Sequence, residues 1–269
     1  SHTQQRLWFI KQMDPGSHVY NIAAAFRMRG RIDLAAFERT FADLVVRHES
    51  LRTRFLAIEG TPRCAIDSQA AVAIERLDLT SLDVDAGELA AMDAMVALSK
   101  RPFDIAHAPL LHCLLIKVAS DRHYFSFCID HIVSDGLSLG ILMTDFVALY
   151  TQHAGGPLAS LPALPLQYVD YADWERRAFE QGALAEQIGY WKRQLAGLPA
   201  LVTLPSDRPR PPLQTSRGAR SVLQLPVELS PQLKSLARGE GATLFKLLLS
   251  AFQIVLHRYC GETDLPVGS

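Results

Sequence analysis

The sequence predicts an α/β protein of 269 residues. Two patterns alternate along it: apolar residues at three- and four-residue spacing, as in amphipathic helices, and short apolar runs, as in buried strands. The clearest helix covers 33–48, and the clearest strands cover 110–118 and 124–129. Apolar residues make up 49% of the chain and charged residues 20%, which is typical of a protein with a large buried core.

Start and stop signals bound each element in turn. Ser1, Asp33 and either Ser81 or Asp83 are side chains of the kind that cap helix N-termini. Proline or glycine follows the first and third of these helices and ends them. The first half is therefore expected to contain helices over 1–13, 33–48, 86–100 and 139–150, and strands over 19–28, 61–77 (one or two segments), 110–118 and 124–129.

Proline-rich stretches organise the second half. The prolines between 155 and 165 form the first clear linker, so we expect one part at 1–164 and a second at 165–269. Residues 204–212 contain four prolines and should be irregular, because proline lacks a backbone donor. The other elements expected are helices over 168–180, 183–195, 230–240 and 243–259, a strand over 221–225, and the beginning of a strand over 263–269, where the sequence stops.

Charge and cysteine content limit the class of protein. With 27 basic and 28 acidic side chains the formal charge is −1, so nothing favours nucleic acid or an anionic membrane as a partner. No stretch reaches the ~20 apolar residues of a membrane-spanning helix, and the start lacks a signal-peptide pattern. The scattered cysteines are expected to be reduced core residues, and the protein to be cytoplasmic. These cysteines are Cys64, Cys113, Cys128 and Cys260.

One polar segment after a buried strand carries the clearest chemistry. Residues 131–136 read HIVSDG and follow the apolar run ending at Ile129. Imidazole ionises near neutral pH, so His131 is well placed to be a general base. By itself the motif equally fits a core histidine, with Asp135 as a helix cap.

Six motifs, in order, resemble those of the condensation domain of nonribosomal peptide synthetases. They cover 1–9 (SHTQQRLWF), 47–55 (RHESLRTRF), 102–111, 168–174, 204–211 and 241–245 (GATLF), and the central motif at 131–136 lies between the third and the fourth. The resemblance implies a fold like that of chloramphenicol acetyltransferase, with two related α/β lobes and the active-site histidine in a tunnel between them. The first lobe would be whole and the second incomplete, since the family's phenylalanine-valine-asparagine motif has no counterpart here.

The resemblance also assigns roles within the central motif. The family pattern is two histidines, three residues, then Asp-Gly; the second histidine, His131 here, is the catalytic one. Asp135 corresponds to a structural residue paired with an arginine, for which Arg52 is the candidate. Removing one partner of such a buried pair typically costs ~3–5 kcal/mol. Gly136 would allow the thioester to approach the backbone closely.

Asp130 departs from the family pattern, because it replaces the first histidine. We expect it to be a solvated turn residue; the alternative is that it lies against His131, favours the imidazolium form and weakens a base. Asp130, Asp135 and Ser138 also fit the pattern of the related heterocyclisation domains. The 47–55 stretch instead resembles the type that joins an L-configured donor to an L-configured acceptor.

The resemblance implies peptide-bond formation between two thioesters held on the 4'-phosphopantetheine arms of upstream and downstream peptidyl carrier domains. An adenylation domain would be adjacent, and the domain itself would need no metal or bound cofactor. His131 would either take the proton of the attacking amine or orient that amine. The competing interpretation is a non-catalytic module of the same fold that docks carrier domains or recruits other enzymes.

Other histidine, glutamate and tryptophan side chains that could suggest a functional site have structural explanations. His48 and Glu49 follow a helix within a structural motif, so a packing role is expected for both. Trp8, Trp174 and Trp191 fall on apolar helical faces and are expected in the core.

Overall fold

The structure, a computed structural model, describes residues 1–198, 202–209, 218–219 and 221–268. It divides into two compact units, Ser1–Ala183 and Leu184–Ser269, and each is described by itself. The first unit extends beyond residue 164 because the next helix, α5 (Tyr168–Glu180), contacts the N-terminal helix.

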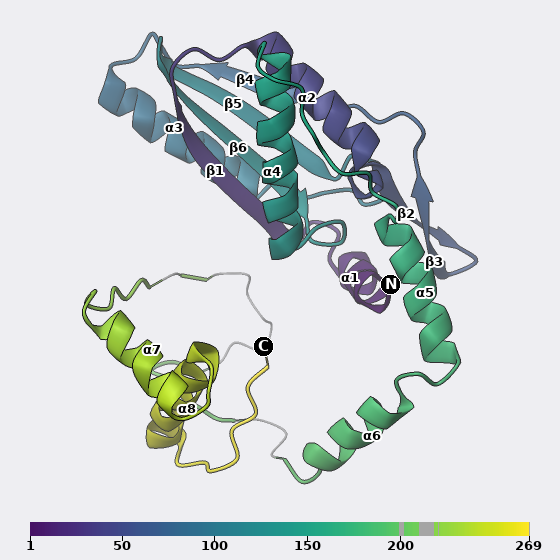
Figure 1. Cartoon of the computed structure of the whole chain (residues 1–269), viewed down its shortest axis with the longest axis vertical. Helices are drawn as coiled ribbons and strands as arrows, with labels where there is room; N and C mark the ends of the chain where they lie inside the picture. The colour runs from purple at the N-terminus through teal and green to yellow at the C-terminus, as the bar shows by residue number, and fades with distance from the viewer. Residues whose placement is uncertain (199–201, 210–217, 220, 269) are drawn as a thin grey trace. The chain divides into compact units, whose positions relative to one another are not determined.

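A four-stranded sheet forms the centre of the first unit (Figure 1). The strand order is β1-β6-β5-β4; only β4 and β5 are parallel, and β5 and β6 form the expected antiparallel pair. The strands are β1 (Asn21–Arg29), β4 (Ile74–Asp78), β5 (Leu111–Ala119) and β6 (Arg122–Asp130). β6 is buried along most of its length, in agreement with the apolar run predicted as a strand over 124–129.

Helices cover both faces of this sheet. Figure 1 shows α2 (Leu34–Arg47) and α4 (Gly136–His153) against one face and α3 (Val84–Ser99) against the other. Asp33 and Asp83 cap α2 and α3 through Ala36 N and Ala86 N, each at 2.9 Å. The expected helices over 33–48, 86–100 and 139–150 are thus confirmed, with α4 beginning three residues earlier than predicted.

An aromatic cluster joins α2, α4 and β6. Phe37 is 1% exposed, and its ring centroid lies 5.0 Å from that of Phe125 and 5.3 Å from that of Phe146. Both pairs are edge-to-face, an arrangement that stabilises aromatic pairs by ~0.5–1.5 kcal/mol beyond burial. The cluster therefore fixes α4 against the strand that ends at the His131 motif.

Smaller elements complete this unit. They are α1 (His2–Met13), the 3₁₀ turn η1 (Glu49–Arg52), the hairpin β2 (Thr53–Ile58) and β3 (Thr61–Ile66), and α5. Glu59 and Gly60 both have positive φ, as a two-residue hairpin turn requires. Tyr168 Oη lies 3.0 Å from Ser1 Oγ, which ties α5 to the start of α1.

The second unit contains three helices in its described residues: α6 (Ala185–Gln194), α7 (Leu229–Gly239) and α8 (Leu244–Cys260). Thr243 caps α8, and Gly261, with a φ of 74°, ends it, as predicted. In the parts of the chain that the structure describes, no single helix is long and apolar enough to cross a bilayer. The pair α7 and α8 reaches that length and composition only when taken together, across a bend of 99°.

Several sequence predictions are wrong. Residues 221–225 and 263–268 form no strand, and no neighbouring described segment hydrogen-bonds to them as a ladder; Ser269 and 210–212 of the predicted irregular stretch lie outside the described residues. Cys64 is exposed because it lies on the two-stranded hairpin. Trp174 and Trp191 are 60% and 56% exposed, since a helical apolar stripe does not reveal whether another element covers it.

Candidate active site

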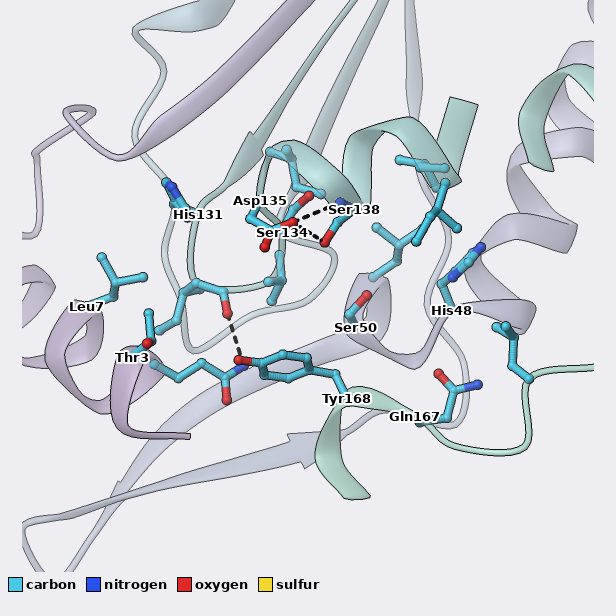
Figure 2. Close-up of a pocket in the computed structure, with 18 of the residues that line it drawn as sticks. Thr3, Leu7, His48, Ser50, His131, Ser134, Asp135, Ser138, Gln167 and Tyr168 are labelled. Atoms are coloured by element: carbon cyan, nitrogen blue, oxygen red, sulfur yellow. Dashed lines mark hydrogen bonds between the residues drawn. The ribbon is translucent and has the colours of Figure 1, made fainter. Parts of the chain in front are cut away.

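A cavity of about 370 Å³ opens beside the His131 motif. Its walls come from α1, η1, the loop after β6, the start of α4 and residues 164–168, all within the first unit. Figure 2 shows His131, Ser134, Asp135 and Ser138 around this cavity, together with Tyr168 from the start of α5. Apolar lining residues include Leu7, Leu51, Ile129, Ile132, Val133, Ile141 and Leu142. The cavity can therefore hold a mostly apolar group next to an imidazole.

His131 is the first residue after β6, and its backbone is held firmly. Its N–H donates to Tyr20 O at 3.0 Å, and the two rings meet edge-on with centroids 6.4 Å apart. The His131 residue is exposed, and its side chain makes no hydrogen bond or ion pair with any residue that the structure describes. An imidazole that is fixed at its base and free at its ring can act on a substrate group.

Asp130 is buried, so its predicted place as a solvated turn residue is wrong. It is only 5% exposed and lies on the inner side of the turn, where Oδ2 is 3.9 Å from Lys11 Nζ. Burial raises the pKa of this carboxyl, while the bond from Ile132 N and the charge of Lys11 oppose that shift. The turn buries Asp130 because α1 packs over it, and no local sequence signal reports that packing.

Asp135 caps α4 and does not pair with Arg52, so that predicted ion pair is wrong. Its carboxylate accepts hydrogen bonds from Ser138 N at 2.8 Å and Ser138 Oγ at 2.6 Å (Figure 2), and these bonds hold its pKa below the usual range. Arg52 instead donates to Glu49 Oε1 at 3.2 Å and to Asp67 O at 3.0 Å. Both of these partners lie outside the 131–136 motif.

Gly136 is the first residue of α4 and is exposed. Among the residues that the structure describes, no neighbouring atom lies within 4 Å of the place that a Cβ would occupy there, so no contact with these residues requires a glycine. The expected close approach of a thioester at Gly136 stays a prediction.

Asp145 is a buried carboxylate that the sequence analysis missed. It is 5% exposed, and its Oδ2 lies 2.8 Å from both Arg47 Nε and His48 Nε2. The bond to Asp145 gives His48 a structural role, as expected from the sequence. His48 also forms part of the cavity wall. One signal could have found Asp145: it lies on the apolar stripe of α4, between Leu142 and Phe146.

The comparisons with known proteins complete this description. A family model described as the condensation domain matches residues 1–269. The chain belongs to the condensation-domain family. Among curated relatives, one of the linear gramicidin synthase proteins of Brevibacillus parabrevis and the phosphinothricin tripeptide synthetase PhsC of Streptomyces viridochromogenes are each 40% identical over the whole chain. The chain spans 4% and 25% of the lengths of these two multidomain relatives.

Solved structures agree with the condensation-domain fold. The X-domain in complex with OxyB from teicoplanin biosynthesis matches 98% of this chain with a TM-score of 0.83 and 28% identity. The first condensation domain of the CDA synthetase matches 97% with a TM-score of 0.75; at 22% identity, that likeness concerns the fold alone. The chain spans 57% and 62% of those two chains, respectively.

Proposed function

We propose that this condensation domain forms an amide bond between a donor acyl or peptidyl thioester and the amine of an acceptor aminoacyl thioester. The observation that carries the proposal is His131, which borders the cavity and which matches the family's catalytic histidine in the motif at 131–136. The name of the Streptomyces relative, a tripeptide synthetase, supports peptide-bond formation as the reaction class.

In the proposed reaction the acceptor nitrogen attacks the thioester carbon, and the C–S bond breaks when the tetrahedral intermediate collapses. The nitrogen loses one proton, and the departing sulfur gains one. His131 can accept the proton from nitrogen or orient the neutral amine through a hydrogen bond. Holding both reactants in near-attack geometry is itself worth ~7–11 kcal/mol in favourable cases. The apolar part of the cavity wall would limit the access of water, which would otherwise hydrolyse the thioester.

The substrates would arrive on carrier domains. Each acyl group would be attached to the 4'-phosphopantetheine arm of an upstream or downstream peptidyl carrier domain, with an adenylation domain loading the acceptor. The RHESLRTRF stretch at 47–55 favours an L-configured donor and an L-configured acceptor. The domain would bind no cofactor of its own, and the protein would act in the cytoplasm.

A transfer assay tests the proposal. Donor and acceptor carrier proteins are loaded with L-aminoacyl groups and mixed with the protein, and mass spectrometry follows the acceptor carrier. The proposal expects the acceptor to gain the donor acyl mass, and expects less transfer from a D-configured donor. An acceptor carrier that gains no donor mass, with both carriers fully loaded, would contradict amide formation. With a cysteine, serine or threonine acceptor, a product lighter by one water would instead indicate heterocyclisation, in which the side-chain thiol or hydroxyl attacks the new amide carbonyl and water leaves; Asp130 and Asp135 raise this alternative.

The likeness to the X-domain supports a second candidate, a module that docks carriers or recruits an enzyme. That X-domain was solved bound to OxyB, and it matches nearly the whole of this chain. A recruiting module would bind loaded carriers or a partner enzyme without forming product. Binding by pull-down in the absence of transfer would favour it over the enzyme.

A further inference from the structure

We propose that Asp130 and Lys11 are positioning residues for His131: Asp130 closes the turn that presents the imidazole, and Lys11 balances the buried charge of Asp130. This inference rests on the proposed function for its activity readout. It also has a readout that needs no reaction, so the two can fail separately.

Asp130 closes the turn around His131 in two ways. Its Oδ1 accepts a hydrogen bond from Ile132 N at 2.9 Å, which is the bond of an Asx turn, and its carbonyl accepts one from Val133 N at 3.1 Å. His131 lies between these bonds and donates its own N–H to Tyr20 O. The direction of the imidazole therefore depends on the Asp130 side chain, although the two side chains share no hydrogen bond.

Lys11 approaches the turn from α1. Its Nζ donates to Ser17 O at 2.7 Å and lies 3.9 Å from Asp130 Oδ2; the exposed fractions of the Lys11 and Asp130 side chains are 12% and 6%. A buried carboxylate is costly without a partner cation. Gln4, also on α1, donates from Nε2 to Ile132 O at 3.0 Å. Helix α1 thus contacts the turn in two places: Lys11 lies near the Asp130 carboxylate, and Gln4 hydrogen-bonds to the backbone of Ile132.

The charge environment of Asp130 agrees with this arrangement. Burial raises the pKa of the carboxyl, and the opposing influences are the Ile132 N–H, Lys11 and His131. Asn21, which pairs with Asp130 across β1 and β6, is neutral. Lys11 is the cation on α1 that lowers the pKa of the Asp130 carboxyl.

Variants at 130 separate the turn bond from the charge. Asp130→Ala removes the Oδ1 acceptor and is expected to lower kcat for acyl transfer by about 10- to 100-fold with little change in KM, because His131 loses its fixed direction. Asp130→Asn keeps an Oδ1 acceptor and is expected to stay within about threefold of the parent. Asp78→Ala is the matched control: it removes the same kind of bond, to Thr80 N at 2.9 Å, at the end of β4. Equal kcat for Asp130→Ala and the parent, or equal damage in the Asn variant, would overturn the turn-closing role.

The second test needs no turnover. Diethyl pyrocarbonate labelling of His131 is followed by peptide mass spectrometry, with the exposed His107 as internal reference. Because loss of the turn bond would change the surroundings of the imidazole, we expect an altered labelling rate in Asp130→Ala, and parent-like labelling in Asp130→Asn and Asp78→Ala. Unchanged labelling in a folded Asp130→Ala protein would overturn the positioning role. If the variants label as expected but the parent protein transfers no acyl group, the result would count against the proposed function alone.

A double-mutant cycle tests Lys11. Lys11→Met leaves the Asp130 charge buried without its cation, so it should lower the melting temperature and kcat. In the Asp130→Asn background there is no charge to balance, and the same change should have a clearly smaller effect. Equal effects of Lys11→Met in the two backgrounds would overturn the coupling. This cycle also avoids dependence on Asp130→Ala, should that variant not fold.

Discussion

The loss of stability in an Asp135→Ala variant distinguishes two roles for Asp135. One is the observed cap of α4, and the other is the buried pair with Arg52 that the resemblance implied. In Asp135→Ala, Ser138 N and Ser138 Oγ lose their shared acceptor. A lost N-cap side chain costs ~0.5–2 kcal/mol, and the lost negative charge at a helix N-terminus adds ~0.3–1 kcal/mol at an exposed site. The two contributions together predict a loss of about 1–3 kcal/mol. Loss of one partner of a buried ion pair would instead cost ~3–5 kcal/mol.

The assay is urea unfolding of the parent and three variants, with acyl transfer measured in parallel. Asp83→Ala is the matched control, because Asp83 caps α3 through one bond of 2.9 Å away from the cavity. It should lose ~1 kcal/mol of unfolding free energy with unchanged transfer. Asp135→Ala should lose slightly more stability and also transfer more slowly, since α4 begins beside His131. Asp135→Asn should recover most of both. A loss clearly above about 3 kcal/mol, or a loss near zero, would refute this explanation of Asp135.

Three further outcomes follow from the same contacts. Arg52→Ala should leave acyl transfer nearly unchanged, because its partners are Glu49 and Asp67 O; a loss equal to that of Asp135→Ala in the transfer assay would restore the predicted pair. Asp145→Ala should lower the free energy of unfolding in urea by ~3–5 kcal/mol, because Arg47 and His48 lose their shared carboxylate partner. A loss below ~1 kcal/mol would contradict this role. The raised pKa of Asp130 means that the folded state binds its proton more tightly than the unfolded state, so this contribution to stability is present at acid pH and is lost as pH rises through the folded pKa. The unfolding free energy of Asp130→Asn relative to the parent should therefore increase from about pH 4 to about pH 7, and a flat or falling difference would contradict the burial.

Elements with local signals could be predicted from the sequence. Asp33 and Asp83 cap their helices because each precedes an apolar-periodic run, and β5 and β6 pair across a short polar turn. The predicted strand at 221–225 had a suitable composition but no neighbour to pair with in the described residues, and a strand cannot be defined by composition alone.

The place of the candidate site in the chain could be predicted from the sequence, but its side-chain contacts could not. His131 follows from its place after a buried strand and from the order of the motifs, and it does border the cavity. The pairing of Arg52 could not be derived, because its partner Glu49 lies at the other end of a 3₁₀ turn that the sequence did not predict. The burial of Asp130 depends on α1, which is more than a hundred residues away in the sequence. Charge pairing is a property of the packed structure, and residue types in a motif do not determine it.

The most direct test of the central claim is the rate of acyl transfer by His131→Ala under single-turnover conditions, with both carriers loaded. General acid–base catalysis typically contributes ~10²–10⁴-fold, so we expect the rate to fall by at least ~100-fold while the melting temperature stays near that of the parent. His107→Ala, a change at an exposed histidine away from the cavity, should keep the parent rate. A His131→Ala protein that transfers the donor at the parent rate would contradict the assignment of His131.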